Sequence, residues 1–507
     1  MSEIAIAPSA VTARTAAFCL AVPGAKYDLP QPVGWRLTGA GATQAGMATK
    51  AVELWHDLTP DTDYRLDADG FAPLSFRTAP CAGLIDAADY ASTDAADNTA
   101  ALQRAIDAVP AGGTLMLPKG RWLSGPLFLK SAMTLYLADG AELAAITDRA
   151  AYPVLEPWRG DHVLGSWEGL PDACFAALIT AIDCRDLAIT GPGIIDGGGD
   201  RGDWWTWPKE TRDGARRPRV LHLIGCEDLT LAGPVIRNSP SWTVHPYRCR
   251  RLTAVGLSVQ NPAESPNTDG FDPESCEDVT IEGVHFSVGD DCIAIKAGKR
   301  ALGRTDHLLP TRNVAVRHCL MERGHGGVVL GSEMSGGIHG VTVEDCDMRR
   351  TDRGLRIKTR RGRGGAVTDV TFRRVVMDGV DTAITANAFY FCDPDGKDEP
   401  VQSREAVPVD ETTPRIADIL VEDVELKNLR IAVAALLGLP EAPVENVRLA
   451  RLSASFDPQA QPASPLMACH VKRLRHAGII TEFTHLTIGE GGLPDGLSVS
   501  EGISTPC

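Results

Sequence analysis

The sequence is short of several features, and each shortage excludes a class of protein. Only 6% of the 507 residues are aromatic, and 66 Asp and Glu outnumber 50 Lys and Arg, which leaves a net charge of -16. Such a surface repels phosphate backbones, so we expect no nucleic-acid partner. No apolar run reaches the roughly 18 residues of a transmembrane helix. The sequence therefore predicts no membrane partner either.

Paired cysteines are missing as well. The 13 cysteines run from Cys19 to Cys507, are odd in number and include no Cys-x-x-Cys pair, which argues against a zinc knuckle or a thioredoxin motif. We interpret them as buried small side chains in a reducing compartment. An export signal is also not convincing, because Glu3 precedes any Lys or Arg and Pro23 interrupts the apolar stretch. We expect a cytoplasmic location, with the periplasm as the alternative.

The N-terminal segment has the pattern of a small β-sandwich. Residues 5–79 alternate short β-rich runs with Pro and Gly turns. The segment Leu58-Thr-Pro-Asp-Thr-Asp-Tyr64 resembles the Leu-x-Pro-x-Thr-x-Tyr segment of fibronectin type III domains, in which the tyrosine forms a corner contact. The sequence therefore predicts a fibronectin III-like β-sandwich over residues 1–80.

One amphipathic helix is predicted next. Leu102, Ala105, Ile106 and Val109 recur at helical spacing after the candidate N-cap segment 97–99. Helical periodicity then disappears and short strands alternate with turns. A single helix ahead of such strands is expected to cap the open apolar end of a repeat structure.

A repeat of short strands dominates the rest of the chain. Successive marker residues lie 23 to 29 positions apart, with three enlarged intervals of 42, 35 and 49. This period predicts a right-handed parallel β-helix with loop insertions over residues 81–507, and hence an all-β protein. A leucine-rich horseshoe is the rival fold, but the rungs carry no Asn ladder and no helix. The markers are Leu187, Leu229, Leu252, Val279, Val314, Val341, Val370, Ile419 and Val447.

Four polar clusters interrupt consecutive rungs, each 10 or 15 residues after its marker. Similar offsets in a stacked coil place the clusters on one face, about 4.8 Å apart per rung, so they predict a cleft. Each cluster alone is also a good turn sequence. The clusters are Asn267-Thr-Asp269-Gly, Gly289-Asp290-Asp291, Gly324-His325-Gly326 and Arg356-Ile-Lys358.

Three of the cluster side chains are carboxylates, and crowding them costs repulsion unless a proton is shared. A shared proton is how a carboxyl group is kept available for acid catalysis near neutral pH. Successive side chains of a strand point to opposite faces, so Asp290 and Asp291 share the cleft only if the strand ends or bulges there. Gly289 favours such an interruption.

The four clusters, in this order, resemble the hallmark segments of the polygalacturonase family, glycoside hydrolase family 28. The resemblance implies a pectin-lyase-like β-helix that hydrolyses α-1,4-linked galacturonate with inversion. It makes Asp290 the general acid and Asp269 and Asp291 the pair that activates water, with His325 and Asn267 in support. Inverting glycosidases separate acid and base by about 6.5–9.5 Å to admit a water, a distance that two rungs and a doublet can span.

A basic segment predicts an anionic ligand. Residues 353–363 carry six cations in 11 residues of an otherwise acidic chain. Arg356 and Lys358 match the substrate-binding pair of the family, and Arg suits a uronate carboxylate in bidentate geometry. The other four are open to interpretation as surface loop charges. Tyr390, in the largest insertion, is expected to line the cleft.

The long loops also predict where the substrate is cut. The three enlarged rungs place loops on both sides of the active rungs, and such loops can wall a groove into a pocket that accepts only a chain end. The segments Arg237–Trp242 and Gly331–Gly336 resemble bacterial exo-polygalacturonases with a fibronectin-like N-terminal domain. We therefore expect an exo-acting enzyme on galacturonate oligomers or polygalacturonate, without a metal or cofactor.

Other functions remain open at the level of the sequence. An endo-polygalacturonase or a rhamnogalacturonan-type hydrolase would use the same motifs. A pectate lyase would need calcium held by acidic residues and a basic residue that abstracts a proton. A noncatalytic polysaccharide-binding β-helix would gain nothing from three crowded carboxylates.

Overall fold

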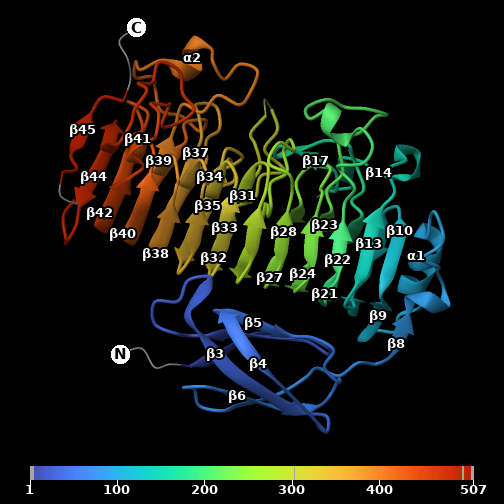
Figure 1. Cartoon of the computed structure of the whole chain (residues 1–507). Coiled ribbons are helices and arrows are strands. Elements are labelled where there is room, and N and C mark those ends of the chain that lie inside the picture. The colour runs from blue at the N-terminus through green and yellow to red at the C-terminus, as the bar shows by residue number, and fades with distance from the viewer. Residues whose placement is uncertain (1–4, 302, 494–495, 504–507) are drawn as a thin grey trace.

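A computed structural model describes residues 5–301, 303–493 and 496–503, and it is built almost entirely of β-strands (Figure 1). The first strands form two antiparallel sheets, ordered β1-β2-β5 and β4-β3-β6-β7. The hydroxyl of Tyr64 accepts a hydrogen bond of 2.9 Å from the backbone N–H of Thr59, which is the expected corner contact. The strands are β1 (Ile6–Val11), β2 (Ala16–Leu20), β3 (Asp28–Gly39), β4 (Ala42–Lys50), β5 (Val52–Trp55), β6 (Asp63–Ala68) and β7 (Leu74–Arg77).

From β8 (Leu84–Asp86) onward the chain winds into a right-handed parallel β-helix with three faces, which confirms the predicted fold class. Two faces belong to one 21-stranded sheet. The first of them contains β9 (Gly113–Leu117), β12 (Met133–Leu137), β21 (Arg185–Thr190), β24 (Glu227–Ala232), β27 (Arg250–Val255), β29 (Glu277–Glu282), β32 (Thr311–Arg317), β35 (Ile338–Glu344), β38 (Ala366–Asp378), β40 (Arg415–Leu429), β42 (Val444–Phe456) and β44 (Thr484–Ile488). The second contains β10 (Gly120–Ser124), β13 (Ala141–Ala145), β22 (Ile194–Asp196), β25 (Val235–Arg237), β28 (Ser258–Gln260), β30 (His285–Ser287), β33 (Leu320–Arg323) and β36 (Asp347–Arg349).

The third face carries the polar clusters and is made of a four-stranded and a seven-stranded sheet. The bridging residues Phe271 and Glu274 join the two sheets. The four-stranded sheet contains β11 (Leu127–Leu129), β20 (Ile179–Ile182), β23 (Leu221–Ile224) and β26 (Val244–Tyr247). The seven-stranded sheet contains β31 (Asp291–Ile295), β34 (Gly326–Gly331), β37 (Arg353–Lys358), β39 (Thr382–Asn387), β41 (Ala432–Leu437), β43 (Ala477–Glu482) and β45 (Val499–Glu501).

Short elements decorate the loops between these faces. Six two-residue strands form hairpins: β14 (Val154–Leu155), β15 (Trp158–Arg159), β16 (His162–Val163), β17 (Ser166–Trp167), β18 (Leu170–Pro171) and β19 (Cys174–Phe175). The helical elements are η1 (Ala87–Asp89), α1 (Thr99–Ala108), η2 (Arg149–Ala151), η3 (Trp204–Thr206) and α2 (Glu399–Gln402). Within the residues that the structure describes, we find no helix with the length and apolar character that a bilayer crossing requires.

The predicted markers stack in register. Each of the nine, from Leu187 to Val447, pairs with the next along the first face. The coil is longer than the sequence pattern indicated, because Gly113 and Met133 stack before Leu187 and Leu486 stacks after Val447. These outer rungs were missed because their strands lack the similar segments by which the inner rungs were aligned.

A left-handed residue precedes every marker and explains the local sequence. All nine have positive φ, a region that Gly, Asn and Asp tolerate best. Arg251 is the one residue of the nine that is not Gly, Asn or Asp. Its guanidinium donates hydrogen bonds of 2.6 and 2.8 Å to the carboxylate of Asp228. The nine are Asp186, Asp228, Arg251, Asp278, Asn313, Gly340, Asp369, Asp418 and Asn446.

Cysteines form a second internal ladder. Cys226 and Cys276 each accept, through sulfur, the backbone N–H of the cysteine on a neighbouring rung, Cys184 and Cys249 respectively. All four side chains are buried, and every described cysteine is free, whereas Cys507 lies outside the described residues. Nine of the twelve described cysteines are buried and serve as small core residues, as predicted, whereas Cys81, Cys392 and Cys469 are partly exposed.

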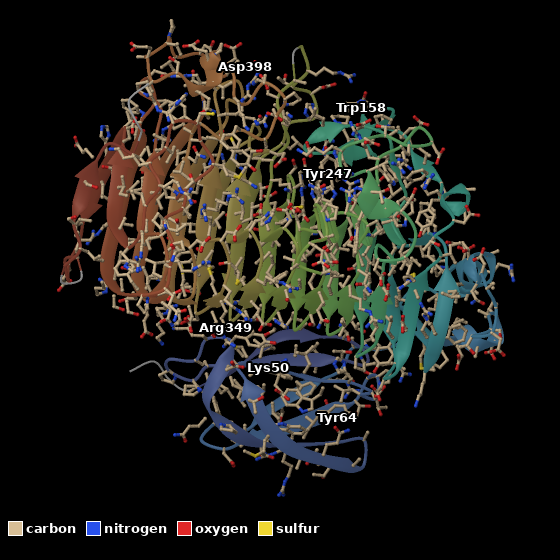
Figure 2. All side chains as sticks on the ribbon, turned by 45° about the horizontal axis from the view of Figure 1, so that its top comes forward. Lys50, Tyr64, Trp158, Tyr247, Arg349 and Asp398 are labelled. Atoms are coloured by element: carbon tan, nitrogen blue, oxygen red, sulfur yellow. The ribbon has the colours of Figure 1, made fainter. Side chains whose placement is uncertain are left out.

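Helix α1 lies at the N-terminal end of the coil, as predicted (Figure 1). Its residues Leu102, Ala105 and Ile106 are fully buried in the same core as the rungs. The β-sandwich instead packs against the side of the coil, below its middle rungs in Figure 1. Arg349 lies at this junction, where its guanidinium is 3.4 Å from the carboxylate of Asp28 (Figure 2).

Three glycines make room for the sandwich. The same turn on three successive rungs is occupied by a glycine with positive φ, namely Gly233, Gly256 and Gly283. A Cβ at these positions would collide with His56, Leu54 and Val52 respectively, which are alternate residues of β5 and its end. The turn glycines are therefore needed for close approach as well as for backbone conformation.

We predict that Gly256→Ala destabilises the protein more than Gly160→Ala. Both glycines have φ near +60°, so each alanine carries a similar left-handed penalty of about 1–2 kcal/mol. Only the Cβ at Gly256 meets Leu54, whereas nothing lies within 4 Å at Gly160, which adds about 1–3 kcal/mol of overpacking. Denaturant unfolding measures the difference, and equal losses would contradict the proposed contact.

Candidate active site

The three carboxylates come from two neighbouring rungs of the third face. Asp291 is the first residue of β31, and Asp290 precedes the strand, so the two side chains escape strict alternation as the sequence requires. Asp269 lies in the turn one rung earlier, where the backbone N–H of Gly270 donates to the carbonyl of Asp291. Parallel pairing therefore brings all three to one place.

The carboxylates are closer together than we expected. One oxygen from each of Asp269, Asp290 and Asp291 lies within 4.8 Å of the others. This nearest approach is shorter than the roughly 6.5–9.5 Å between the carboxyl groups of a typical inverting pair. Neighbouring parallel strands are about 4.8 Å apart, and adjacent rungs with no insertion between them impose that distance. Asp290 is the most accessible, with 22% of its side chain exposed, against 6% for Asp269 and 1% for Asp291.

The environment separates the charge states of two of these groups. Burial, together with the charge of Asp290, raises the pKa of Asp269 to about 7, against the opposing charge of Lys296. Burial also disfavours ionised Asp291, but Lys358 and Arg356 outweigh it and hold the pKa of Asp291 well below its usual range. Near neutral pH the cluster thus holds a firmly anionic carboxylate beside one that keeps a proton readily.

His325 lies beside Asp290, as predicted. Its Nδ1 is 3.2 Å from Oδ1 of Asp290, and this hydrogen bond raises the pKa of His325 to about 9. The imidazole is therefore protonated near neutral pH and donates to the carboxylate. Asn267 also lines the site, and its Oδ1 accepts a hydrogen bond of 2.6 Å from Arg217.

The predicted basic pair points into the same cluster. Arg356 Nη1 and Lys358 Nζ contact the two oxygens of Asp291 at 3.1 and 2.7 Å. Both cations also lie over the ring of Tyr390, at 5.6 and 5.2 Å from its centroid. The structure thus brings every site residue predicted from the sequence to one place, with Tyr390 beneath the basic pair.

Lys296 is a further member of the site that the motifs did not reveal. Its ammonium lies 3.4 Å from Asp269, 3.4 Å from Asp272 and 3.6 Å from Glu333, and 4.3 Å from the centroid of the Trp242 ring. Burial alone would lower the pKa of Lys296, but these carboxylates raise it well above its usual value. The available signal was its position directly after β31, which begins at Asp291 and ends at Ile295. Residues five apart on a regular strand lie on opposite faces, so a shared site required that one of them sit at a strand end.

Asp272 is a buried carboxyl group within the same cluster. Neither of its oxygens accepts a hydrogen bond from a described residue, although Lys296 is 3.4 Å away. Burial and the neighbouring charge of Asp269 raise the pKa of Asp272 well above its usual value. Asp272 therefore holds a proton more readily than an exposed aspartate does, which lessens the negative charge that Lys296 must balance.

Loops from distant parts of the chain wall the site. Glu168 comes from the hairpin before β20, Lys209 from the first enlarged rung and Asp393 from the largest insertion. On the far side of Arg356, the sulfur of Met467 approaches a guanidinium nitrogen to 3.2 Å, and Asn387 donates to the Met467 carbonyl at 2.8 Å. The loops around Glu168 and Met467 lie outside the enlarged intervals that the sequence pattern singled out.

This combination of fold and site defines a class. A parallel β-helix with three crowded carboxylates, one of them readily protonated, and a cationic pair beside them is equipped for acid–base hydrolysis of an acidic polysaccharide.

Comparisons with known proteins agree with that class. The profile of Glycosyl hydrolases family 28 matches residues 166–431. A probable polygalacturonase of Vitis vinifera is 33% identical over 366 residues, which cover 70% of each chain. An endo-polygalacturonase of Pectobacterium parmentieri is 30% identical, over 59% of this chain and 73% of that one. The chain therefore belongs to glycosyl hydrolases family 28 and is a glycoside hydrolase.

Solved structures show the same fold over most of the chain. The family 28 exopolygalacturonase of Yersinia enterocolitica superposes with a TM-score of 0.66 at 20% identity, and covers 98% of this chain and 99% of its own. The exopolygalacturonase of Thermotoga maritima superposes with a TM-score of 0.65 at 24% identity, and covers 82% and 91%.

We predict that Lys296→Met destabilises the protein by about 3–5 kcal/mol, because it leaves buried carboxylates unpaired. Folding raises the pKa of Asp269 to about 7, so its ionisation destabilises the fold as the pH rises toward that value, and Lys296 limits the loss. The effect of the substitution is therefore larger at about pH 8 than at about pH 5.

Lys427→Met is the matched control. The ion pair between Lys427 and Glu425 is 46% and 50% exposed, so its loss is expected to change the unfolding free energy by less than about 1 kcal/mol at either pH. Urea unfolding at both pH values measures the two variants. If Lys296→Met lost as little unfolding free energy as the control at both pH values, Lys296 would not balance the buried carboxylates.

Proposed function

We propose that this family 28 hydrolase is a polygalacturonase that acts from a chain end and inverts the anomeric configuration. The observation that supports hydrolysis most directly is the carboxylate cluster, in which a proton is retained near neutral pH although Asp291 beside it stays anionic. Galacturonate oligomers or polygalacturonate are the substrate, and Arg356 and Lys358 bind a uronate carboxylate at the scissile bond.

Asp290 is the general acid in this proposal. It is the most exposed of the three carboxylates, and a general acid must reach the glycosidic oxygen. The cluster supplies the proton, because Asp269 retains one up to a pH of about 7 and the nearest oxygens lie within 4.8 Å. Protonated His325 donates a hydrogen bond to Asp290. The proton that Asp269 takes from the attacking water passes to Asp290 and restores the acid for the next turnover.

Asp269 and Asp291 activate the water, and the basic pair holds the substrate. Arg356 and Lys358 each use one donor on Asp291. A guanidinium has five N–H donors and an ammonium has three, so both retain donors for a uronate carboxylate. Inversion rests on the family resemblance, since the separation of the carboxylates is itself nearer the roughly 5–5.5 Å of retaining enzymes.

The loop walls support exo action. Glu168, Lys209 and Asp393 bound the site on one side, and the loop of Met467 closes over Arg356 on another. The names of the relatives indicate different modes of cleavage. The Pectobacterium protein is called an endo-polygalacturonase, and the Yersinia structure is called an exopolygalacturonase. The latter match extends over nearly all of both chains, including the β-sandwich.

We predict that Asp290→Asn lowers kcat by about 10²–10⁴-fold, the usual contribution of a general acid, in a protein that still unfolds cooperatively. Reducing-sugar release from polygalacturonate measures kcat. Asp306→Asn is the control. Asp306 is an exposed loop aspartate, so we expect its substitution to leave activity unchanged. More than a tenth of the wild-type kcat in the Asp290 variant would remove its assignment.

We also predict that monomer or dimer appears in the first minutes while the viscosity of polygalacturonate falls slowly, because a walled pocket admits only chain ends. Proton NMR of the first products shows the β anomer if the α linkage is inverted. A rapid fall in viscosity with a ladder of oligomers would indicate an endo enzyme, and an initial α anomer would indicate retention.

Two further readouts separate hydrolysis from the action of a calcium-dependent lyase. A hydrolase gives saturated products, and its activity is insensitive to a chelator.

A further inference from the structure

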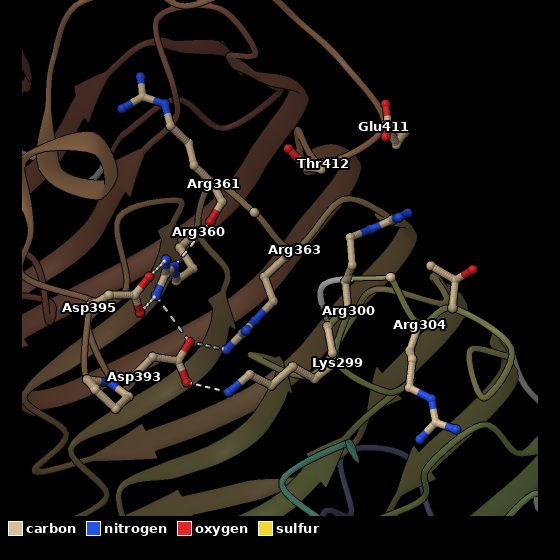
Figure 3. A pocket seen from close by; sticks show the side chains of 15 residues that line it. Lys299, Arg300, Arg304, Arg360, Arg361, Arg363, Asp393, Asp395, Glu411 and Thr412 are labelled. Carbon is tan, nitrogen blue, oxygen red and sulfur yellow. Dashed lines mark hydrogen bonds and ion pairs between the residues drawn. The ribbon is translucent and has the colours of Figure 1, made fainter. Parts of the chain in front are cut away.

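A second cavity of about 700 Å³ adjoins the catalytic pocket. Its walls come from the loops that follow β31, β37 and β39, the strands of the third face that also carry the site (Figure 3). Three carboxylates line it, from Asp393, Asp395 and Glu411. Six cations line it as well, and they are Lys299, Arg300, Arg304, Arg360, Arg361 and Arg363.

A row of cations leads from the catalytic carboxylates into this cavity. Arg356, Lys358 and Arg360 alternate along β37 and its extension, so their side chains leave the same face of the strand. The first two contact Asp291, and the third lines the cavity. Arg360 is 7% exposed and Arg363 4%, so they are not the solvated loop charges that the sequence allowed.

Asp393 forms the partition between the two cavities, since it lines both. Its carboxylate is held by Lys299 at 2.5 Å, Arg363 at 2.7 Å and Arg360 at 3.2 Å. Arg360 also binds Asp395, at 2.6 Å. These ion pairs account for the acidic groups on that side of the cavity.

Two arginines on the cavity wall have no such partner. Dashed contacts in Figure 3 join Lys299, Arg360 and Arg363 to the aspartates, whereas Arg300 and Arg304 have none. Among the residues that the structure describes, neither forms an ion pair, and the buried Nε of Arg300 has no acceptor. Arg304 lies over the ring of Trp158 at 5.4 Å.

We propose that this cavity is a distal uronate site, in which Arg300 and Arg304 bind a carboxylate of the same substrate chain that occupies the catalytic pocket. The inference rests on the proposed function, because it takes the substrate to be an oligogalacturonate. A guanidinium binds a carboxylate through two parallel hydrogen bonds. Neutral sugars offer no group that replaces those bonds, so the site selects chains that are acidic beyond the scissile bond.

The test is the dependence of affinity on chain length. Titration calorimetry with di- to hexagalacturonate uses the full chain carrying Asp290→Asn, which prevents turnover. Adding Arg300→Gln and Arg304→Gln is expected to weaken binding about tenfold or more for oligomers that reach the cavity. The loss for digalacturonate is expected to stay below about twofold. The ratio between long and short ligands is therefore the readout.

Arg312→Gln and Arg448→Gln form the matched control. Both arginines are exposed on strands of the 21-stranded sheet, so this pair removes the same net charge away from the cavity. The control is expected to leave the length dependence unchanged. A similar loss of long-oligomer affinity in the control would attribute the effect to net charge and overturn the proposal.

Two further outcomes would overturn it. The first is an equal loss for every chain length, or no loss at any length. The second is binding of inorganic phosphate as tight as that of the longest oligomer and abolished by the same two substitutions, which would make the cavity a free-anion site. Cleavage of the oligomers by the Asp290→Asn protein during titration would count against the assigned general acid alone.

Discussion

In-register stacking of parallel rungs is the constraint on which the rest of this structure depends. Adjacent strands are held about 4.8 Å apart by backbone hydrogen bonds, so residues one rung apart in sequence are forced into contact whatever their charge. Asp269 and Asp291 are brought together in this way. The repulsion that results is relieved by a retained proton and by buried cations rather than by distance.

Charge balance then decides which groups are reactive. Asp291 is the most buried of the three carboxylates and remains ionised because Lys358 and Arg356 contact its two oxygens. Asp269 shares Lys296 with Asp272 and Glu333, so its cation is divided among several acids. Equivalent side chains on neighbouring rungs thereby acquire different protonation behaviour, which is the separation that acid–base catalysis requires.

The same coil also determines where its inserted loops lie. A loop added between rungs must leave the stack sideways, so loops from the third face gather around the site and the adjoining cationic cavity. The β-sandwich uses another side, where turn glycines permit close packing. Substrate contacts and the sandwich junction can therefore change independently while the stacked core stays the same.

Period and motif spacing determined much of this protein from sequence alone. The nine markers stack as their intervals predicted, and the four polar clusters meet, because a regular coil converts sequence distance into position. The tertiary structure decided what the period does not encode: the carboxylate spacing, the role of Lys296 as a shared counter-ion, and the cavity beside Asp393. These depend on side-chain direction at strand ends and on loop paths, which contacts between distant segments select.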